Sequence, residues 1–350
     1  MSDESLVAML DRQRRAAATA LAPEALDYFA TGSAEEISLG EASDAWRARR
    51  LRPHVLCDVA EVSTTTAVLG TPLASPIVVA SVAYQRLAHP EGEIATARGA
   101  SRAGTLMVVP TRATTRIEEI ATALDAPWWF QVYVVRDRGL TRELVLRARA
   151  AGATALLLTG DTPLIGRKPR QGDPPVPDNL YYINFREHLG DRADARDATL
   201  QDASITLDTI SWLRDLSGLP VLVKGVLRAD DAVACLDAGA AGVVVSNHGA
   251  RQLDRAVSSA EALPGVADAM GDRGAVLVDG GVRTGGDALT ALALGAHAVL
   301  VGRPVIWALA GEGADGVSSL LLALRDDLMH AMALAGVTEV AGITRDLIAD

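Results

Sequence analysis

The chain has 350 residues, of which 49% are hydrophobic and only 4% aromatic, and its formal net charge at pH 7 is −11. The acidic balance argues against a nucleic-acid partner, and the polar N-terminus does not resemble a signal peptide. No apolar run reaches the roughly 18 residues that a membrane-spanning helix needs. We therefore expect a cytoplasmic protein without a membrane partner.

The chain has two cysteines, Cys57 and Cys235. Neither has a Cys or His neighbour at the spacing of a metal site, so we expect no bound metal. Both are expected to be buried thiols of a reducing compartment.

Residues 1–75 are predicted to form an N-terminal extension, with helical segments in 22–48 that are interrupted at 31–33. After this extension, short apolar runs alternate with helical patterns. The apolar runs are 77–80, 106–109, 128–134, 155–159, 221–224, 242–246, 275–279 and 298–302. The helical patterns are 91–103, 117–124, 141–151, 207–216, 229–238, 259–270 and 285–294, followed by an amphipathic helix over 317–335.

Apolar runs that alternate with helices predict parallel strands joined by right-handed crossovers, and eight such strands can close a barrel. The predicted fold is therefore α/β, a (β/α)8 TIM barrel that forms a single domain over residues 1–350. An open doubly wound sheet is the alternative, because the number of strands alone does not exclude it.

The alternation is interrupted between the fourth and fifth runs by residues 165–204. This segment is first rich in proline and then charged, and it makes the connection longer than a crossover requires. Long loops in compact domains are commonly lids or disordered segments. We expect a lid, because the segment follows a strand that carries a candidate site residue. The alternative is a solvated insertion.

The sixth apolar run ends in residues 246–254, where His248 and Arg251 follow a run of valines. In a (β/α)8 barrel the active site lies at the C-terminal ends of the strands. His248 can accept a proton, and Asp161 at the fourth strand end can stabilise its charged form. Arg251 suits a carboxylate, and Tyr133 can hydrogen-bond a hydroxyl. The alternatives are a polar turn for 246–254, a helix N-cap for Asp161 and an interior aromatic for Tyr133.

The last two strand ends, 279–283 and 302–303, carry glycine-rich turns with an arginine. Their backbone N–H groups and guanidinium groups predict a phosphate site. Asp279 suits a ribityl-type hydroxyl instead. Lys224 ends an apolar strand and needs an anion or an electron-rich partner, such as a flavin edge that gains charge on reduction. A Schiff-base role and a structural ion pair are the alternatives for Lys224.

Taken in chain order, these motifs resemble those of the FMN-dependent L-2-hydroxy acid oxidases and dehydrogenases, the family that includes glycolate oxidase. The matching stretches are 27–32, 88–93, 131–133, 161–163, 223–225, 246–254, 279–283 and 302–305. The resemblance implies a bound FMN, with His248 as the base, Asp161 assisting it and Tyr133 on the substrate hydroxyl. The implied cofactor contacts are Ala80, Ser81, Val82, Gln131, Thr159, Lys224, Ser246, Asp279, Gly281, Arg283, Gly302 and Arg303.

The resemblance also implies that Arg251 and Tyr28 bind the substrate carboxylate. Three features depart from the family pattern, and one of them is Ser81-Val82, where relatives often have Pro and a small polar residue. Arg112 stands where glycolate-oxidising relatives carry tryptophan, and Lys168 stands where the family has a second arginine. Arg167 and Arg170 are the alternative residues for the role of that second arginine.

The stretch 82–87 resembles the 4-hydroxymandelate oxidases more than the glycolate oxidases, and the missing tryptophan makes room for an aryl ring. We expect Tyr84, Arg112 and Lys168 in the substrate site, and (S)-4-hydroxymandelate or mandelate as the substrate. Lactate- or glycolate-type acids are the alternatives, as is another FMN barrel activity such as isoprenoid diphosphate isomerisation. Oxygen is the expected electron acceptor, a quinone or carrier protein being the alternative. The resemblance suggests a homotetramer.

Overall fold

The computed structural model describes residues 4–168, 176–190 and 192–349. At its centre is a sheet of eight parallel strands in the order β4-β11-β10-β9-β8-β7-β6-β5. A further parallel bridge between Val79 and Met107 joins the two end strands and closes the sheet. The (β/α)8 barrel is confirmed, and the open sheet is excluded. The strands are β4 (Ile77–Val79), β5 (Val108–Val109), β6 (Trp128–Val132), β7 (Ala153–Thr159), β8 (Val221–Val226), β9 (Gly242–Val245), β10 (Ala275–Asp279) and β11 (Ala298–Val301).

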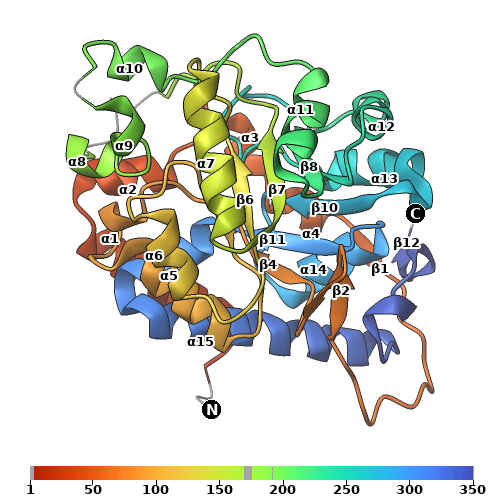
Figure 1. Ribbon diagram of the computed structural model, residues 1–350. Helices are drawn as coiled ribbons and strands as arrows, with labels where there is room; N and C mark the ends of the chain where they lie inside the picture. Colours follow the sequence, from red (N-terminus) through yellow and green to blue (C-terminus); the bar gives the residue numbers. More distant parts are fainter. Residues whose placement is uncertain (1–3, 169–175, 191, 350) are drawn as a thin grey trace.

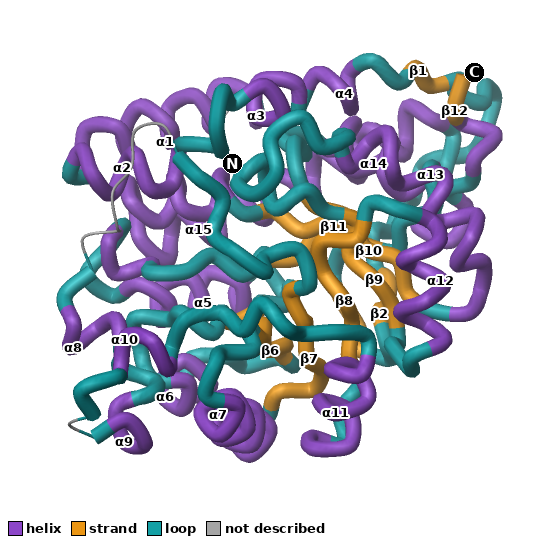
Figure 2. The backbone as a smooth tube through the Cα atoms, turned by 90° about the horizontal axis from the view of Figure 1, so that it is seen from above, coloured by secondary structure: helices purple, strands orange, loops and turns teal. Residues whose placement is uncertain are grey.

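The strands are apolar throughout because successive side chains point to opposite faces and both faces are covered. One set fills the barrel interior, including Trp129, Leu157, Val244 and Leu277. The alternate set packs against the surrounding helices, which Figure 2 shows on the outside of the strands. The helices that follow the strands are α5 (Gly92–Arg102), α6 (Ile117–Thr122), α7 (Arg138–Ala150), α11 (Asp208–Ser217), α12 (Ala229–Asp237), α13 (Ser259–Met270), α14 (Gly285–Ala293) and α15 (Arg303–Ala335).

Helix α15 is much longer than the predicted helix over 317–335. It begins at Arg303, directly after β11, and continues through a kink at Gly313, where φ is +57°. Among the described helices, α15 alone is long and apolar enough to cross a membrane by length and composition, and 56% of its apolar window is buried inside the protein. It packs against α1 (Leu6–Ala20) and α5, along the lower side of Figure 1. This burial is that of a core helix.

The N-terminal extension covers the rim of the barrel near the β9 end. Its helices after α1 are α2 (Pro23–Ala30), α3 (Ile37–Glu41) and α4 (Asp44–Arg47), so the predicted break at 31–33 is confirmed. The Asp254 carboxylate accepts hydrogen bonds from the backbone N–H groups of Glu35, Ile37 and Ser38, and so caps α3 from another part of the chain. The extension is thereby fixed to the loop that follows β9.

Two short antiparallel pairs complete the fold. The hairpin of β2 (Thr66–Val68) and β3 (Thr71–Leu73) packs Val68 and Leu73 against the barrel interior. Strand β1 (Arg50–Leu51) pairs with β12 (Ile348–Ala349), which links the N-terminal extension to the C-terminal end.

The described part of the insertion 165–204 forms three short helices: α8 (Asp178–Tyr181), α9 (Arg186–Leu189) and α10 (Ala195–Ala198). Asn184 anchors it, because its side chain bonds the backbone of Ala113, Thr115 and Ile117. Phe185 is buried beside it. The described segment therefore packs on the barrel and is not simply solvated, and its role as a lid stays a prediction.

The two cysteines differ in their surroundings. Cys235 is buried in α12, as predicted, and burial raises the pKa of its thiol to about 11. Cys57 is exposed, so the prediction of a second buried thiol was wrong. It lies in a connection without regular structure between β1 and β2, where no apolar pattern could indicate burial.

A buried carboxylate fixes the loops that follow β4 and β5. Glu93 on α5 is fully buried and accepts hydrogen bonds from the backbone N–H groups of Gln85 and Thr114. It also accepts bonds from the hydroxyls of Thr114 and Thr115. These partners are close in sequence to Tyr84 and Arg112. One side chain therefore holds both loops in register with each other.

Replacing this carboxylate should destabilise the protein strongly. We expect Glu93→Ala to lower the free energy of unfolding by about 3 kcal/mol or more, because each buried donor left unsatisfied costs about 1–3 kcal/mol. Urea unfolding followed by circular dichroism measures the change. Glu91→Ala is the matched control: this residue lies next to α5, and its ion pair with Arg98 is exposed. Equal effects of the two substitutions would contradict the structural role of Glu93.

Candidate active site

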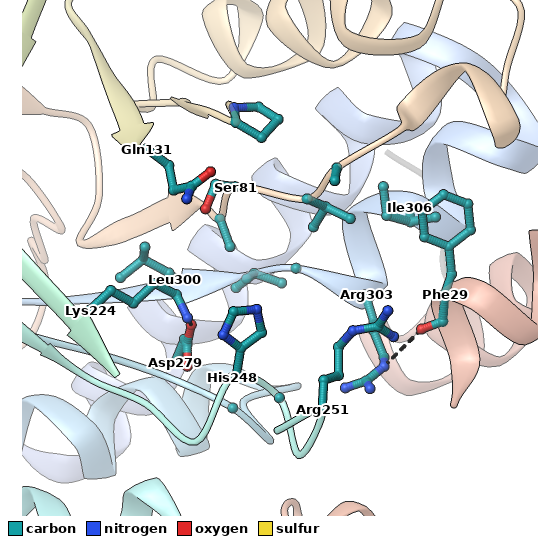
Figure 3. Close-up of a pocket in the computed structure, with 18 of the residues that line it drawn as sticks. Phe29, Ser81, Gln131, Lys224, His248, Arg251, Asp279, Leu300, Arg303 and Ile306 are labelled. Carbon is teal, nitrogen blue, oxygen red and sulfur yellow. Dashed lines mark hydrogen bonds and ion pairs between the residues drawn. The ribbon is translucent and has the colours of Figure 1, made fainter. Parts of the chain in front are cut away.

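A cavity opens at the C-terminal ends of the barrel strands (Figure 3). It encloses about 980 Å³ free of protein atoms, a volume that includes its opening to solvent. The predicted site residues that line it are Tyr28, Ala80, Ser81, Val82, Gln131, Tyr133, Thr159, Lys224, His248, Arg251, Asp279, Gly281, Arg283, Gly302 and Arg303. Residues from seven strand ends and from α2 therefore meet at one place.

The turn after β9 has an unusual backbone. His248, Gly249 and Ala250 all have left-handed conformations, with φ of +59°, +62° and +61°. A non-glycine residue there costs about 1–2 kcal/mol, so the turn must be held by its surroundings. The backbone N–H of His248 donates to Ser246 Oγ at 3.0 Å, and that of Ala250 donates to Asn247 Oδ1 at 3.1 Å. The tight reversal directs His248 and Arg251 into the cavity.

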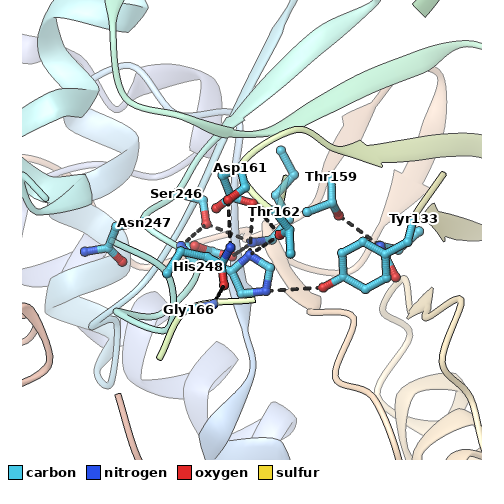
Figure 4. A network of polar contacts seen from close by, with 12 residues as sticks. Tyr133, Thr159, Asp161, Thr162, Gly166, Ser246, Asn247 and His248 are labelled. Atoms are coloured by element: carbon cyan, nitrogen blue, oxygen red, sulfur yellow. Dashed lines mark hydrogen bonds and ion pairs between the residues drawn. The ribbon is translucent and has the colours of Figure 1, made fainter. Parts of the chain in front are cut away.

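The imidazole of His248 lies between a carboxylate and a phenol (Figure 4). Its Nδ1 is 2.9 Å from Asp161 Oδ1, and its Nε2 is 3.4 Å from the Tyr133 hydroxyl. Because Asp161 occupies Nδ1, Nε2 is the nitrogen that faces the cavity. Asp161 itself lies behind the histidine. It packs on Gly225, where a Cβ atom would be 2.4 Å from the Asp161 side chain.

The charges around this pair favour an ionised Asp161. Burial raises the pKa of the Asp161 carboxyl, but the nearby His248 and Lys224 outweigh burial and lower it overall. Burial raises the pKa of Tyr133, so its hydroxyl keeps its proton. A carboxylate that bonds one imidazole nitrogen leaves the other as a proton acceptor and stabilises the imidazolium that forms. This arrangement can act as a general base.

Arg251 is held by the N-terminal extension. Its Nη1 donates to the backbone carbonyls of Tyr28 at 2.6 Å and Thr31 at 3.0 Å, and its guanidinium carbon lies 4.9 Å from the centre of the Tyr28 ring. The side chain of Tyr28 also hydrogen-bonds this guanidinium. A guanidinium group has five N–H donors, so donors remain that can bond a ligand.

Lys224 forms a buried polar cluster on the opposite wall. Its Nζ is 3.0 Å from Asp279 Oδ2 and 2.8 Å from Ser246 Oγ. Burial lowers the pKa of Lys224, but Asp279 and Asp161 outweigh burial and raise it overall. A charged amine lacks the lone pair that a Schiff base needs, so this geometry does not favour the Schiff-base alternative for Lys224. Asp279 Oδ1 is buried without a hydrogen-bond partner in the described chain.

Arg303, at the start of α15, and Arg283, in the loop after β10, lie near each other. Arg303 donates to the carbonyls of Phe29 at 3.0 Å and Thr31 at 3.1 Å, and Arg283 donates to the carbonyl of Val282. Neither forms an ion pair with a carboxylate in the described chain. Burial lowers the pKa of both, that of Arg303 to about 9. Buried cations bonded only to carbonyls at a helix N-terminus form a site for an anion.

Some predicted site residues lie outside the cavity lining. Asp161 and Ser246 support residues that line it. Lys168 lies at its edge, with Nζ 5.8 Å from the centre of the Tyr28 ring. Of the alternative residues for its role, Arg167 is exposed, and Arg170 falls outside the described residues.

Arg112 and Tyr84 contact the insertion and are not part of the lining. The Arg112 guanidinium lies 5.0 Å from the Tyr181 ring centre and 5.2 Å from that of Phe185, and it donates to the carbonyl of Thr199. Tyr84 stacks on Tyr181 at 5.9 Å. The substrate contacts predicted for Arg112 and Tyr84 are therefore not direct contacts with this cavity.

Sequence reasoning gave no role to several apolar residues of the cavity wall. They are Phe29, Leu300, Val301 and Ile306. An apolar side chain at a strand end looks like core in a sequence, so no chemical signal marks it. The sequence pattern predicts that the last helix begins at residue 317. It therefore does not indicate that Ile306 lies on the first turn of α15.

A closed (β/α)8 barrel with a His–Asp pair, a guanidinium group beside the histidine and an anion site is typical of a flavin-dependent oxidoreductase that acts on hydroxy acids. The family model described as FMN-dependent dehydrogenase matches residues 17–350, and the chain belongs to this family. The cofactor is accordingly FMN.

The chain is similar to oxidases of several 2-hydroxy acids. An L-lactate oxidase from Nostoc sp. is 43% identical over 342 residues, covering 93% of this chain and 94% of the relative. Glycolate oxidase 1 from Zea mays is 44% identical, covering 92% and 90%. A mandelate oxidase solved with benzoyl-formic acid superposes with a TM-score of 0.89 at 40% identity, covering 97% of both chains.

The residues of the cavity fit FMN. A phosphate would neutralise the two buried guanidinium groups, and a hydroxyl would satisfy the orphaned Asp279 oxygen. The amide of Gln131 and the hydroxyl of Thr159 share a hydrogen bond of 2.9 Å on the cavity wall, where they can meet the polar edge of a flavin.

Proposed function

We propose that the protein oxidises an (S)-2-hydroxy acid to the 2-oxo acid, with an aryl acid such as (S)-4-hydroxymandelate or mandelate as substrate and oxygen as electron acceptor. The observation that carries the proposal is the 2.9 Å contact between His248 and Asp161. It leaves Nε2 facing the same cavity as Arg251. A proton acceptor and a carboxylate site are the two groups that oxidation of a 2-hydroxy acid requires.

Each protein group has a distinct task in this reaction. Arg251, with Tyr28 beside it, binds the substrate carboxylate and fixes the orientation of the α-carbon. Tyr133 donates a hydrogen bond to the substrate hydroxyl. His248 Nε2 takes up a proton as the hydroxy acid is oxidised, and Asp161 stabilises the resulting imidazolium.

FMN supplies the redox chemistry, because it accepts the two electrons released when the hydroxyl becomes a ketone. The strand ends would hold it. In this assignment Ala80, Ser81 and Val82 would line one side of the flavin. Gln131, Thr159 and Lys224 would meet its polar edge, and Ser246 bonds the lysine. Asp279 would bond the ribityl chain, and the residues that would hold the phosphate are Gly281, Arg283, Gly302 and Arg303.

The aryl substrate is supported by the shape of the cavity wall. Ala83 and Pro110 line the cavity, while the Arg112 side chain next to this wall extends toward the insertion. No bulky side chain from position 112 therefore occupies the space where an aryl ring would lie. The likeness to mandelate oxidase structures points the same way.

A lactate- or glycolate-type substrate is the second candidate, favoured by relatives of those names at 43–44% identity. Specificity among hydroxy acids depends on pocket shape and can change with few side chains. These relatives are named oxidases, which supports oxygen as the acceptor. The homotetramer and the cytoplasmic location stay predictions.

Removing one arginine of the anion site should weaken FMN binding. We expect Arg283→Met to raise the dissociation constant of FMN roughly 10- to 100-fold, because charge-assisted hydrogen bonds contribute about 1.5–3 kcal/mol. Quenching of FMN fluorescence by the apoprotein measures this. The control is Arg273→Met, because Arg273 is an exposed arginine before β10 that pairs with Asp237. Unchanged FMN affinity of Arg283→Met would exclude Arg283 from the phosphate site.

Removing the proposed base should abolish turnover and retain the flavin. The wild-type protein is expected to consume oxygen and form benzoylformate from (S)-mandelate. We expect His248→Gln to lower kcat about 10²- to 10⁴-fold with an unchanged flavin content. An oxygen electrode and the visible spectrum give the two readouts.

The control for this variant is His188→Gln, since His188 is half exposed and pairs with Glu143 away from the cavity. Full activity of His248→Gln would exclude His248 as the base. A wild-type protein that oxidises no 2-hydroxy acid would contradict the proposed function itself.

A further inference from the structure

Three cationic side chains converge at the edge of the cavity where the substrate carboxylate would bind. They come from separate parts of the fold: Lys168 from the start of the insertion, Arg251 from the turn after β9 and Arg303 from the first turn of α15. Figure 3 shows Arg251 and Arg303 side by side. Lys168 and Arg251 share the Tyr28 ring, at 5.8 Å and 4.9 Å from its centre.

The lysine is the member of this cluster that can lose its charge. Arginine stays protonated in proteins, whereas a lysine amine releases its proton when it is buried or placed near other cations. Lys168 is half-buried, and it has neither an ion pair nor a hydrogen bond within the described chain. Burial first, and then repulsion from Arg251 and Arg303, lower the pKa of Lys168 to about 6.

We propose that the Lys168 amine is neutral in the substrate-free enzyme and takes up a proton when the substrate carboxylate binds between it and Arg251. The inference rests on the proposed function, because it needs a carboxylate at this edge. The bound anion would supply the counter-charge that the surrounding residues do not, and so favour the ammonium form. Substrate binding and proton uptake are then linked.

The other charged groups around this edge do not take over the proton uptake that we propose for Lys168. A bound FMN phosphate would offset the positive charge of Arg303. Burial and the charge of Arg251 would still lower the pKa of Lys168. The charge of Glu36 raises the pKa of Arg303, whereas the groups that lower the pKa of Lys168 are Arg251 and Arg303. Tyr28 presents its ring to the lysine, and burial raises the pKa of its hydroxyl, which stays neutral. Among the described residues of the cavity lining, His248 is the other side chain that the test must separate from Lys168, and it is paired with Asp161.

The test uses the FMN-loaded enzyme and phenylacetate, an aryl carboxylate without a hydroxyl to oxidise. Its dissociation constant is measured from the change in flavin absorbance between pH 7 and 8.5. Calorimetry in phosphate and in Tris gives the number of protons taken up. For the wild type we expect uptake approaching one proton and affinity that falls up to about tenfold per pH unit, because the free amine is already neutral above pH 7.

Three variants separate Lys168 from other causes. Lys168→Arg carries a permanent charge, so it should bind phenylacetate with little pH dependence and no proton uptake. Lys168→Met should bind more weakly, also without uptake. His248→Gln keeps the lysine and should retain the uptake. Proton uptake that persists in Lys168→Arg, or is lost in His248→Gln, would overturn the inference.

The two proposals fail in different ways. Oxidation of 2-hydroxy acids without proton uptake on phenylacetate binding would contradict the role of Lys168 alone. Proton uptake without oxidation of any 2-hydroxy acid would contradict the proposed function alone. A flavin spectrum that phenylacetate does not perturb at any pH would also contradict the inference.

Discussion

The turn after β9 is the constraint on which the rest of the site depends. Three consecutive left-handed residues bring His248 and Arg251 to the same cavity from one short segment. Such a backbone is costly for non-glycine residues, and it persists only when neighbouring contacts define it. Those contacts come from Ser246 and Asn247 inside the turn and from the N-terminal extension, which bonds Ala250 and Arg251. The extension is thus part of the active site as well as part of the fold.

The paired and the unpaired charged groups of the site lie in different places. On one wall Lys224 is paired with Asp279, and on another His248 is paired with Asp161. The edge that carries Arg251, Arg303 and Lys168 has no carboxylate of its own within ion-pair distance in the described residues. The anions needed there are those of the ligands, a phosphate and a carboxylate. Binding of cofactor and substrate therefore completes the electrostatics of the fold, and a lysine in this cluster responds to that change as an arginine cannot.

The sequence predicts the barrel and most of the cavity lining because both follow from strong patterns. Buried parallel strands appear as continuous apolar runs, and polar residues directly after them must lie at one rim. The direction of a loop side chain is not contained in such a pattern. The sequence therefore predicts Arg112 in the substrate site without showing its contacts with Tyr181 and Phe185. The apolar wall residues Leu300 and Ile306 resemble core, and only the closed barrel distinguishes them.

The most direct test of the account is anaerobic reduction of the bound flavin. The purified protein is mixed without oxygen with (S)-4-hydroxymandelate or with (S)-lactate, and the visible absorption of FMN is followed. The account predicts fast bleaching by the aryl acid and slow or no bleaching by lactate. Bleaching by lactate alone would contradict the aryl pocket, and a flavin bleached by neither acid would contradict the assignment of the cavity to 2-hydroxy acid oxidation.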